Sequence, residues 1–427
     1  MTDPLLKLAN PLLKLANSRR QGVAEGITSV CSSHPVVIRA AVRDAALFSR
    51  PLLIEATCNQ VNQFGGYTGM QPADFVAAVT AIAGSEGLAP ERVIFGGDHL
   101  GPNPWRKEDA GAAMAKAEDM VSGYVRAGFR KIHLDASMGC AGEPAALDDA
   151  TIARRAARLA RKAEDVASGP DRPLYVIGTE VPPPGGADHL IGEISPTSLS
   201  AVRHTLAVHR QVFHENGLAD AFSRVIAVVV QPGVEFGNEN VVFYDRAKAL
   251  HLRALLEQES GLVYEAHSTD YQTQAALREL VDDGFAILKV GPQLTFVLRE
   301  ALYGLDLIAS DLLPDYGARP LYQTMEALMT ADAKDWHSHY HGSAAQQRVQ
   351  RHYSLSDRIR YYWNHPEAMD AVQQLMTALS GKAVSATLFH QHLPALDRFA
   401  GQPLDPEAVL VAAVQQALEG YRFACGG

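Results

Sequence analysis

Cysteine is scarce in this chain, which has 427 residues and only four cysteines, at widely separated positions. So few cysteines exclude a disulfide framework and fit reduced thiols in the cytoplasm, which is where we expect the protein to act. Cys31 and Cys58 directly follow two apolar runs, and we interpret them as small packing residues rather than metal ligands.

Positive charge is scarce as well, since 38 Lys and Arg stand against 48 Asp and Glu, a net charge of −10 at pH 7. This balance argues against a nucleic-acid partner, although a local pocket of Lys and Arg can still take an anionic substrate. No apolar run approaches the roughly 20 residues of a membrane span, and no secretory leader is recognisable. We therefore expect neither nucleic-acid nor membrane binding.

What the chain does contain is a series of eight short apolar runs, most of them rich in Val, Ile and Leu. They are GITSV (26–30), PLLIEAT (51–57), RVIFGG (92–97), KIHLDAS (131–137), LYVIGTE (174–180), RVIAVVVQP (224–232), LVYEAHS (262–268) and FAILKVG (285–291). Such runs are typical of strands buried on both faces, and helix-length segments separate them. The pattern predicts an α/β fold, a TIM (β/α)8 barrel, with its active site at the carboxyl ends of the strands.

The barrel is expected over residues 22–305, flanked by two other segments. Residues 1–21 form a leader that contains PLLKLAN twice in tandem, at 4–10 and 11–17. The duplication is either an amphipathic turn or a recent slippage with no structural role, and both interpretations stay open. Residues 306–427 have helical patterns and are expected to form an extension that packs on the barrel.

Polar residues end several of the runs, and two of them are His99 and His267. Two imidazoles and one carboxylate form a usual catalytic zinc set with open positions for substrate, and Glu180 or Glu235 can supply the carboxylate. We assign Glu235 to the metal and Glu180 to catalysis. Asp98, next to His99, either transfers a proton to or from a substrate hydroxyl or orients His99.

Further residues near the strand ends are candidates for holding substrate hydroxyl or phosphate groups. They are Asn59 and Gln63 in the polar loop 59–70, the catalytic candidate Asp135, Ser268, Thr269, Lys289 and the turn at Gly291. Backbone amides near Gly291 suit a phosphate, because loops after the last two strands are the usual phosphate position in this fold. Lys289 is the favoured cation, unless it pairs with acids inside the barrel end. The loop 181–190, with three prolines and two glycines, is also expected to face the substrate.

Two segments of the extension each allow a functional interpretation and an interpretation as solvated surface. The sequence DWHSHYHG carries His337, His339 and His341, which we interpret as surface residues rather than a metal site. The sequence SLSDRIRYYW (354–363) is either a solvated helix start capped by Ser356 or an anion clamp. The clamp would reach over the barrel mouth or into a neighbouring subunit, since Arg suits phosphate.

From about Gly22 to Cys425 the chain resembles the Z-subunit family of class II D-tagatose-1,6-bisphosphate aldolase. The resemblance lies in SVCSSHP (29–35), IEATCNQVNQFGGYTGM (54–70), GGDHLGPN (96–103), KIHLDASMGCAG (131–142), VIGTEVPPPGG (176–186), VVVQPGVEF (228–236), VYEAHSTDYQT (263–273), FAILKVGP (285–292) and YSLSDRIRYYW (353–363). It implies that Asp98 handles the C4 hydroxyl and that His99 and His267 bind the metal. Ser268, Glu235 and Gly291 stand where the related catalytic subunits have glycine, histidine and asparagine.

The resemblance implies a role in carbohydrate catabolism, and two functions fit it. The first is a metal-dependent 4-epimerase of a ketohexose or its phosphate, such as tagatose 6-phosphate, acting by retro-aldol and aldol steps. The second is a non-catalytic subunit that stabilises an aldolase Y subunit; a sugar-binding protein without turnover is a weaker third. We expect a divalent metal, zinc first with manganese, nickel or cobalt as alternatives, and a homo-oligomer.

Overall fold

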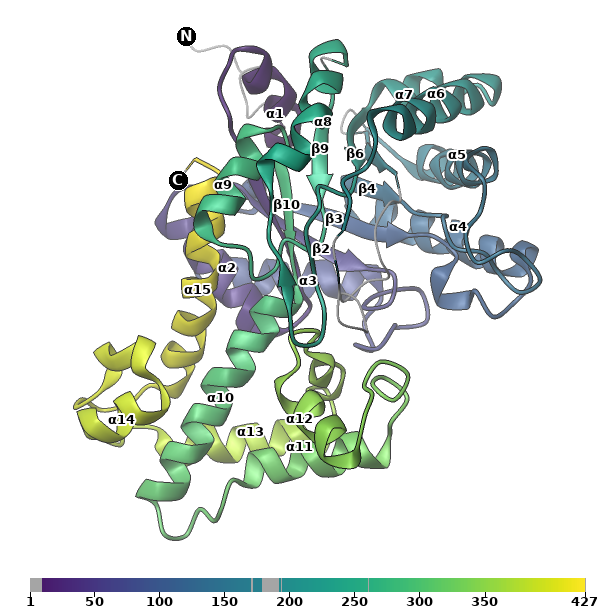
Figure 1. Ribbon diagram of the computed structural model, residues 1–427. Helices are drawn as coiled ribbons and strands as arrows, with labels where there is room; N and C mark the ends of the chain where they lie inside the picture. Colours follow the sequence, from purple (N-terminus) through teal and green to yellow (C-terminus); the bar gives the residue numbers. More distant parts are fainter. Residues whose placement is uncertain (1–9, 170–171, 179–191, 193, 260, 427) are drawn as a thin grey trace.

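Eight parallel strands close into a barrel in the computed structural model of this chain (Figure 1). The structure describes residues 10–169, 172–178, 192, 194–259 and 261–426. Around the barrel the strands follow their order in the sequence: β1 (Ile27–Cys31), β2 (Leu52–Thr57), β3 (Val93–Leu100), β4 (Lys131–Leu134), β5 (Leu174–Ile177), β6 (Val225–Val229), β9 (Val263–Ala266) and β10 (Ile287–Val290). Each strand falls within or against one of the eight apolar runs, and the predicted TIM barrel is confirmed.

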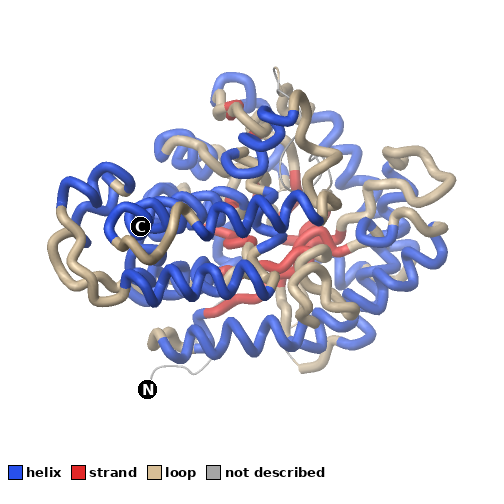
Figure 2. Tube along the Cα trace, turned by 90° about the horizontal axis from the view of Figure 1, so that it is seen from below, coloured by secondary structure: helices blue, strands red, loops and turns tan. Residues whose placement is uncertain are grey.

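Helices surround the strands on the outside, as Figure 2 shows with the strands in red at the centre. They are α2 (Pro35–Leu47), α3 (Pro72–Ser85), α4 (Ala110–Ala127), α5 (Asp149–Val166), α6 (Leu199–Glu215), α7 (Ala219–Ser223), α8 (Arg246–Gln258), α9 (Gln274–Asp282) and α10 (Pro292–Leu312). Short 3-10 turns lie at Pro90–Arg92 (η2) and Asn103–Trp105 (η3), and a two-stranded hairpin, β7 (Glu235–Phe236) with β8 (Val241–Val242), follows β6. Most strand positions are buried, because helices cover one face and the barrel interior fills the other.

The amino end of the barrel is closed by the second copy of PLLKLAN. It forms α1 (Pro11–Arg20), which begins with proline in its first turn and with the Asn10 side chain accepting from the Leu12 amide at 3.1 Å. Leu12 and Leu15 are buried in a cluster with inward residues near the strand starts, among them Ile27 and Leu53. The described copy is therefore an amphipathic helix with a packing role, and the first copy lies almost entirely outside the described residues.

Residues beyond the barrel form a helical extension that lies at the side to which the strand carboxyl ends point (Figure 1). The predicted boundary at residue 305 falls inside α10, which runs from the barrel into the extension. The extension contains α11 (Pro320–Ala331), α12 (Ala344–Tyr353), η4 (Arg358–Tyr362), α13 (Pro366–Leu379), α14 (Ala386–His392), η5 (Pro394–Phe399) and α15 (Pro406–Ala424).

Helix α15 leaves the extension and returns to the barrel, where it packs between α9 and α2 and along α10. Asp405 caps its start by accepting from the Ala408 amide at 3.2 Å. At its far end the Tyr421 hydroxyl donates to the Thr269 carbonyl at 2.8 Å, and Arg50 donates to the Cys425 carbonyl at 2.8 Å. The last helix of the chain thus completes the outer ring of the barrel.

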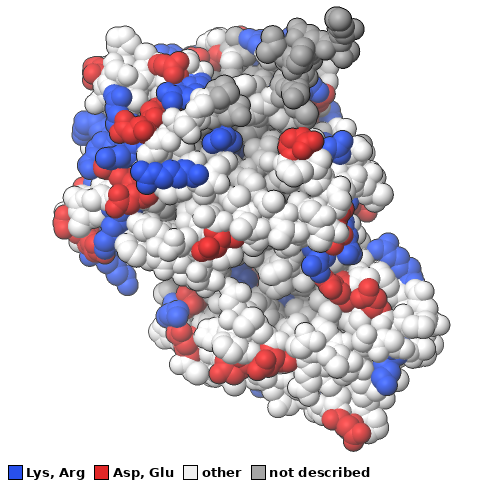
Figure 3. Space-filling model, turned by 180° about the vertical axis from the view of Figure 1, so that it is seen from behind, with Lys and Arg blue, Asp and Glu red and all other residues white. Residues whose placement is uncertain are grey.

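The charged surface gives no sign of a nucleic-acid footprint on the face drawn in Figure 3. Lys and Arg lie there beside Asp and Glu, without a continuous basic stripe. Among the described residues, no helix is both long enough and apolar enough to span a bilayer.

Candidate active site

A cavity opens at the carboxyl ends of the strands, where the TIM barrel predicts the active site. Its walls come from the ends of β1, β2, β3, β9 and β10, from the loops that follow them, and from the extension. The lining residues include Cys31, Ser33, His34, Asn59, Gln60, Tyr67, Asp98, His99, Phe236, His267, Ser268, Asp270, Lys289, Gly291, Thr295, Arg360, Tyr361 and Trp363. Barrel and extension therefore share one cavity.

The end of β3 is shaped to present two consecutive side chains to this cavity. In a regular strand, neighbours such as Asp98 and His99 point to opposite faces. Here the pairing of β3 with β4 shifts register between Gly97 and Leu100, and His99 has a φ of 48°. A bulge of this kind re-aims side chains, and a left-handed residue other than glycine is strained and concentrates at functional sites.

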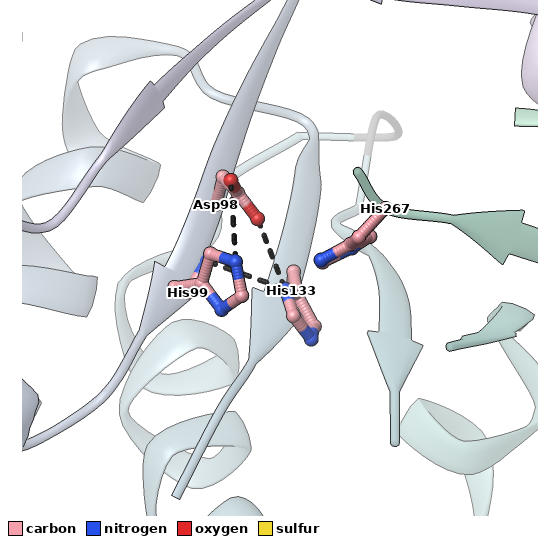
Figure 4. A group of neighbouring side chains, drawn as sticks. All are labelled: Asp98, His99, His133 and His267. Carbon is pink, nitrogen blue, oxygen red and sulfur yellow. Dashed lines mark hydrogen bonds and ion pairs between the residues drawn. The ribbon is translucent and has the colours of Figure 1, made fainter. Parts of the chain in front are cut away.

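Three imidazoles and one carboxylate meet at this point (Figure 4). His99 and Asp98 come from β3, His133 from β4, and His267 follows β9. Each offers one atom suited to a metal, and these four atoms all lie within 4.8 Å of one another. All four residues are buried. The structure thus brings together three of the residues singled out in the sequence and adds His133, which the sequence analysis missed.

His99 and His267 are each held through one ring nitrogen, which leaves the other directed toward the site. His99 Nδ1 donates to Asp135 Oδ2 at 2.8 Å, and His267 Nε2 donates to Glu265 Oε1 at 2.9 Å. His133 is held through both ring nitrogens: Nε2 donates to the Gly178 carbonyl at 3.2 Å, and Nδ1, 3.1 Å from Asp98 Oδ1, accepts from the His99 amide at 3.2 Å. An acceptor behind each histidine is the usual support of a metal ligand, and the arrangement is compatible with a divalent metal.

The charges at the centre favour the protonation states that metal binding requires. Burial, and then the nearby Lys289 ammonium, lower the pKa of His267 well below its usual value, so its imidazole is neutral. Burial opposes ionisation of Asp98, but His99, Lys289 and His133 outweigh it and hold the pKa of this carboxyl well below its ordinary range. His267 therefore presents a neutral imidazole and Asp98 an ionised carboxylate, and both are forms that bind cations.

Beneath the site lies a buried ion network inside the barrel. Lys131 Nζ lies 2.5 Å from Glu55 Oε1 and 2.8 Å from Glu265 Oε2, and all three side chains are fully buried. Burial opposes the charge of Lys131, but the two carboxylates outweigh it and raise its pKa. Lys289 pairs with Asp98 and lies 3.6 Å from both Glu55 Oε2 and Glu265 Oε1. Because Glu265 also holds His267, this network fixes the floor of the site.

Removing one member of this network should destabilise the fold strongly. Lys131→Met leaves two buried carboxylates without their closest cation, and breaking a buried pair in this way costs about 3–5 kcal/mol. We expect a clearly lowered urea midpoint. The control Lys334→Met removes an exposed lysine, 69% accessible, whose bond to Asp332 is 2.7 Å long, and should cost less than about 1 kcal/mol. Equal midpoints for the two variants would contradict the structural role of Lys131.

Several predicted substrate residues line the cavity, and others support it from behind. Asn59, Ser268, Lys289 and Gly291 line it. Ser268 has a φ of 52° directly after His267, and the Gly291 amide donates to Asp270 at 3.0 Å. The amide that we expected to be available for a phosphate is therefore engaged by a carboxylate.

Asp135, Thr269 and Gln63 lie outside the lining. Asp135 orients His99 and accepts from the Ser137 hydroxyl at 2.8 Å. Thr269 is fully buried, and its hydroxyl donates to the Lys289 carbonyl at 2.5 Å. Gln63 turns toward α4, where it donates to the Lys116 carbonyl at 2.9 Å, and Gln60 lines the cavity in its place.

The two predicted carboxylates, Glu235 and Glu180, are not in the four-residue group of the described chain. Glu235 is fully buried in β7, its Oε1 accepts from the Phe236 amide at 2.9 Å, and burial raises the pKa of its carboxyl to about 7. Its role as a metal ligand stays a prediction. Glu180 lies outside the described residues, as does the loop 181–190, and its catalytic role likewise stays a prediction.

The extension contributes the segment for which two interpretations were open. The region 354–363 does not form a solvated helix start; it forms the short turn η4, and Arg360, Tyr361 and Trp363 line the cavity. The reach over the barrel mouth is thus confirmed, while anion binding stays a prediction. His337 and His341 are exposed and belong to no metal-competent cluster of the described chain.

Known proteins match this chain along nearly its whole length. Residues 12–426 match the model of the family described as D-tagatose-1,6-bisphosphate aldolase subunit GatZ/KbaZ-like. A relative from Agrobacterium fabrum (strain C58), named D-tagatose 6-phosphate 4-epimerase, is 60% identical over 413 residues, which are 96% of this chain and 97% of the relative.

A solved structure from Sinorhizobium meliloti 1021, described as a probable tagatose 6 phosphate kinase, is 54% identical with a TM-score of 0.86. The match covers 94% of this chain and all of that one. These matches, together with the fold and the site at the strand ends, show that the chain belongs to the GatZ/KbaZ-like family of D-tagatose-1,6-bisphosphate aldolase subunits.

Proposed function

We propose that the protein is a ketose phosphate 4-epimerase that interconverts tagatose 6-phosphate and fructose 6-phosphate. The observation that carries the proposal is the group of Asp98, His99, His133 and His267 at the barrel mouth. It lies in a chain 60% identical, over almost its full length, to a relative named for this epimerisation. A subunit with a purely stabilising role has no physical need to keep four ionisable groups buried together, because burying them costs free energy.

His99 and His267 would hold a divalent cation, since each has one ring nitrogen directed to the site and a hydrogen-bond acceptor behind the other. His133 would join them through Nδ1, which belongs to the same group and accepts from the His99 amide when no cation is bound. Imidazole ligands suit zinc best, with manganese, nickel and cobalt as alternatives. When bound, the cation would polarise the C2 carbonyl of the sugar and stabilise the negative charge that develops next to it.

Asp98 is the group proposed to move the proton. Its carboxylate is ionised and faces the cavity beside the three imidazoles, so it can accept the proton of the C4 hydroxyl. Lys289 pairs with Asp98 from the floor of the site and holds the carboxylate in place. As the proton leaves, the C3–C4 bond breaks and its electron pair stays on the C1–C3 half.

Cleavage gives a three-carbon enediolate and glyceraldehyde 3-phosphate, with no net gain or loss of atoms or electrons. If the aldehyde presents its other face before the bond re-forms, the new C4 has the opposite configuration. Asp98 then returns the proton to the C4 oxygen. The same residue thus serves both directions, as an epimerase near equilibrium requires, and neither a nucleotide nor a second substrate takes part.

The test uses the purified full-length protein with tagatose 6-phosphate and no nucleotide, followed by NMR. With added Zn²⁺, Mn²⁺, Ni²⁺ or Co²⁺ we expect fructose 6-phosphate to appear, and we expect EDTA to abolish the conversion. Free tagatose, run in parallel, shows whether the phosphate is required. Conversion that persists in EDTA after dialysis would contradict the metal dependence, and no conversion at all would contradict the proposed activity.

The family description favours one other candidate, a subunit that stabilises a class II aldolase Y subunit. This candidate predicts no turnover by the protein alone, a stable complex on co-expression with a Y subunit, and a higher aldolase activity of that partner. Size-exclusion chromatography of the protein alone and with the partner separates the two candidates and measures the expected homo-oligomer.

A further inference from the structure

We propose that Arg360, which the extension places over the barrel mouth, binds the phosphate group of the sugar phosphate. The site is a phosphomonoester subsite built outside the barrel strands, and it rests on the proposed function. Arg360 lines the same cavity as Asp98, His99 and His267, so one ligand can touch the imidazole group at one end and the guanidinium at the other.

Charge distinguishes Arg360 from the other cation of the cavity. Among the described residues, Lys and Arg contribute two lining side chains, Lys289 and Arg360. Lys289 is neutralised by Asp98, with Glu55 and Glu265 within 3.6 Å. Its charge is therefore compensated by carboxylates in the floor of the site and is not available to a phosphate.

Arg360 has no carboxylate partner within ion-pair distance in the described chain. Its guanidinium donates to the Ser356 and Asp357 carbonyls and to the Tyr361 hydroxyl, and it stacks over the Tyr361 ring at 4.4 Å from the centroid. Backbone carbonyls and a phenol orient the guanidinium, and the carboxylates of Asp357 and Asp270 act on its charge only from beyond ion-pair distance. An arginine held in this way is suited to a phosphate, which it can meet with two parallel hydrogen bonds.

The position expected for a phosphate from the fold is already taken by an acid. At the start of α10 the amides of Gly291 and Gln293 donate to Asp270 Oδ1 at 3.0 and 2.8 Å. Because Asp270 also lines the cavity, its carboxylate would repel a second anion at this helix terminus. The positive charge for the phosphate must therefore come from elsewhere in the cavity, and Arg360 supplies it.

The turn that carries Arg360 is fixed in advance of binding. Asp357, with a φ of 46°, accepts from Arg299 Nε at 2.9 Å and from the Thr295 hydroxyl at 2.7 Å, and both partners lie on the buried side of α10. The Leu355 amide donates to the Asn238 carbonyl, beside the β7–β8 hairpin, at 2.9 Å. A guanidinium held by such anchors loses little further freedom when it binds a ligand.

Binding the phosphate would also keep the reacting fragments together. The phosphate is on C6, so after the C3–C4 bond breaks it belongs to the aldehyde half. A guanidinium that holds this half while C4 turns its other face prevents its escape, and re-addition gives the epimer. Loss of the guanidinium should therefore both weaken substrate binding and release glyceraldehyde 3-phosphate.

The test compares Arg360→Met and Arg360→Lys with the wild type, using NMR initial rates with tagatose 6-phosphate. Hydrogen bonds to charged groups contribute about 1.5–3 kcal/mol, so we expect KM to rise by about 10- to 100-fold in Arg360→Met. In Arg360→Lys, which keeps a charge but cannot form two parallel hydrogen bonds, KM should rise less. Escaped glyceraldehyde 3-phosphate, followed with its dehydrogenase and NAD, should increase in Arg360→Met.

The matched control is Arg398→Met, because Arg398 is exposed and lies over the neighbouring Phe399 ring at 5.2 Å, as Arg360 lies over Tyr361. It should leave KM and the release of aldehyde unchanged. Unchanged KM and release in both Arg360 variants, with epimerisation intact, would overturn the phosphate subsite and leave the proposed function standing. If the wild type has no epimerase activity, calorimetric titration of tagatose 6-phosphate into wild type and Arg360→Met still decides whether Arg360 binds it.

Discussion

Replacement of His133 by alanine is expected to remove the bound divalent metal and to reduce the turnover of tagatose 6-phosphate by more than about 100-fold. Loss of a hydrogen-bonding partner behind a metal ligand already costs about 10–100-fold in affinity or activity, and loss of a ligand itself should cost more. His133 Nδ1 lies 3.1 Å from Asp98 Oδ1 in the centre of the group. Metal content by inductively coupled plasma mass spectrometry and NMR initial rates measure the two effects.

The control for His133→Ala is His209→Ala, which also removes a buried imidazole. His209 is 1% exposed on α6, and its Nδ1 donates to the Thr205 carbonyl at 2.8 Å, away from the cavity. It should retain metal and turnover per folded molecule. A His133→Ala variant with wild-type metal content and activity would show that His133 only packs against the site.

Asp98→Asn is expected to keep the metal and lose the reaction. The substitution preserves shape but removes the acceptor for the C4 hydroxyl proton, and the loss of a positioned general base lowers kcat by about 10²–10⁴-fold. Three imidazoles remain to hold the cation, so metal content should fall little. Both kcat, by NMR, and the metal content are to be measured on the same preparation.

A buried aspartate remote from the cavity provides the comparison for Asp98→Asn. Asp283 is 1% exposed and accepts from the Tyr244 hydroxyl at 3.0 Å and from Arg246 Nη2 at 2.7 Å, so Asp283→Asn should affect stability and leave kcat close to the wild type. Metal loss in Asp98→Asn in proportion to the loss of kcat would assign Asp98 to the ligand set instead of to proton transfer.

The barrel could be predicted from the sequence because each strand is buried on both faces and therefore appears as a short apolar run. The burial of all five residues of β6 is an example. The helices between the runs could be placed because their apolar residues recur at helical spacing. The path of α15 could not be predicted, because an amphipathic helix does not specify which exposed groove it fills.

His133 was missed because it stands inside an apolar run rather than at its end. The signal was nevertheless present in KIHLD: Lys131 and His133 are two residues apart and share one face of β4. A lysine and a histidine on one face of a doubly buried strand require acidic or metal partners inside the barrel. Glu55 and Glu265 also lie inside apolar runs and therefore also require partners inside the barrel. They are the partners of Lys131.

The four-residue group could be predicted in part because strand ends converge in a barrel, which places Asp98, His99 and His267 together whatever their separation in sequence. The bulge that lets Asp98 and His99 share one face depends on local pairing with β4, which residue types alone do not determine. The cover formed by η4 depends on long-range contacts such as the buried pair of Asp357 with Arg299, and the sequence left two interpretations of that segment open.

The return of α15 to the barrel bears on how the chain folds as it is made. Helix α15 lies between α9 and α2, so α2 is synthesised long before the helix that packs against it. Until the residues of α15 have left the exit tunnel, the apolar surface that this helix covers stays open to the solvent. A protein whose outer helix ring is completed this late exposes this surface to aggregation in the meantime. We expect its yield in cells to depend on chaperones that shield nascent and newly released chains.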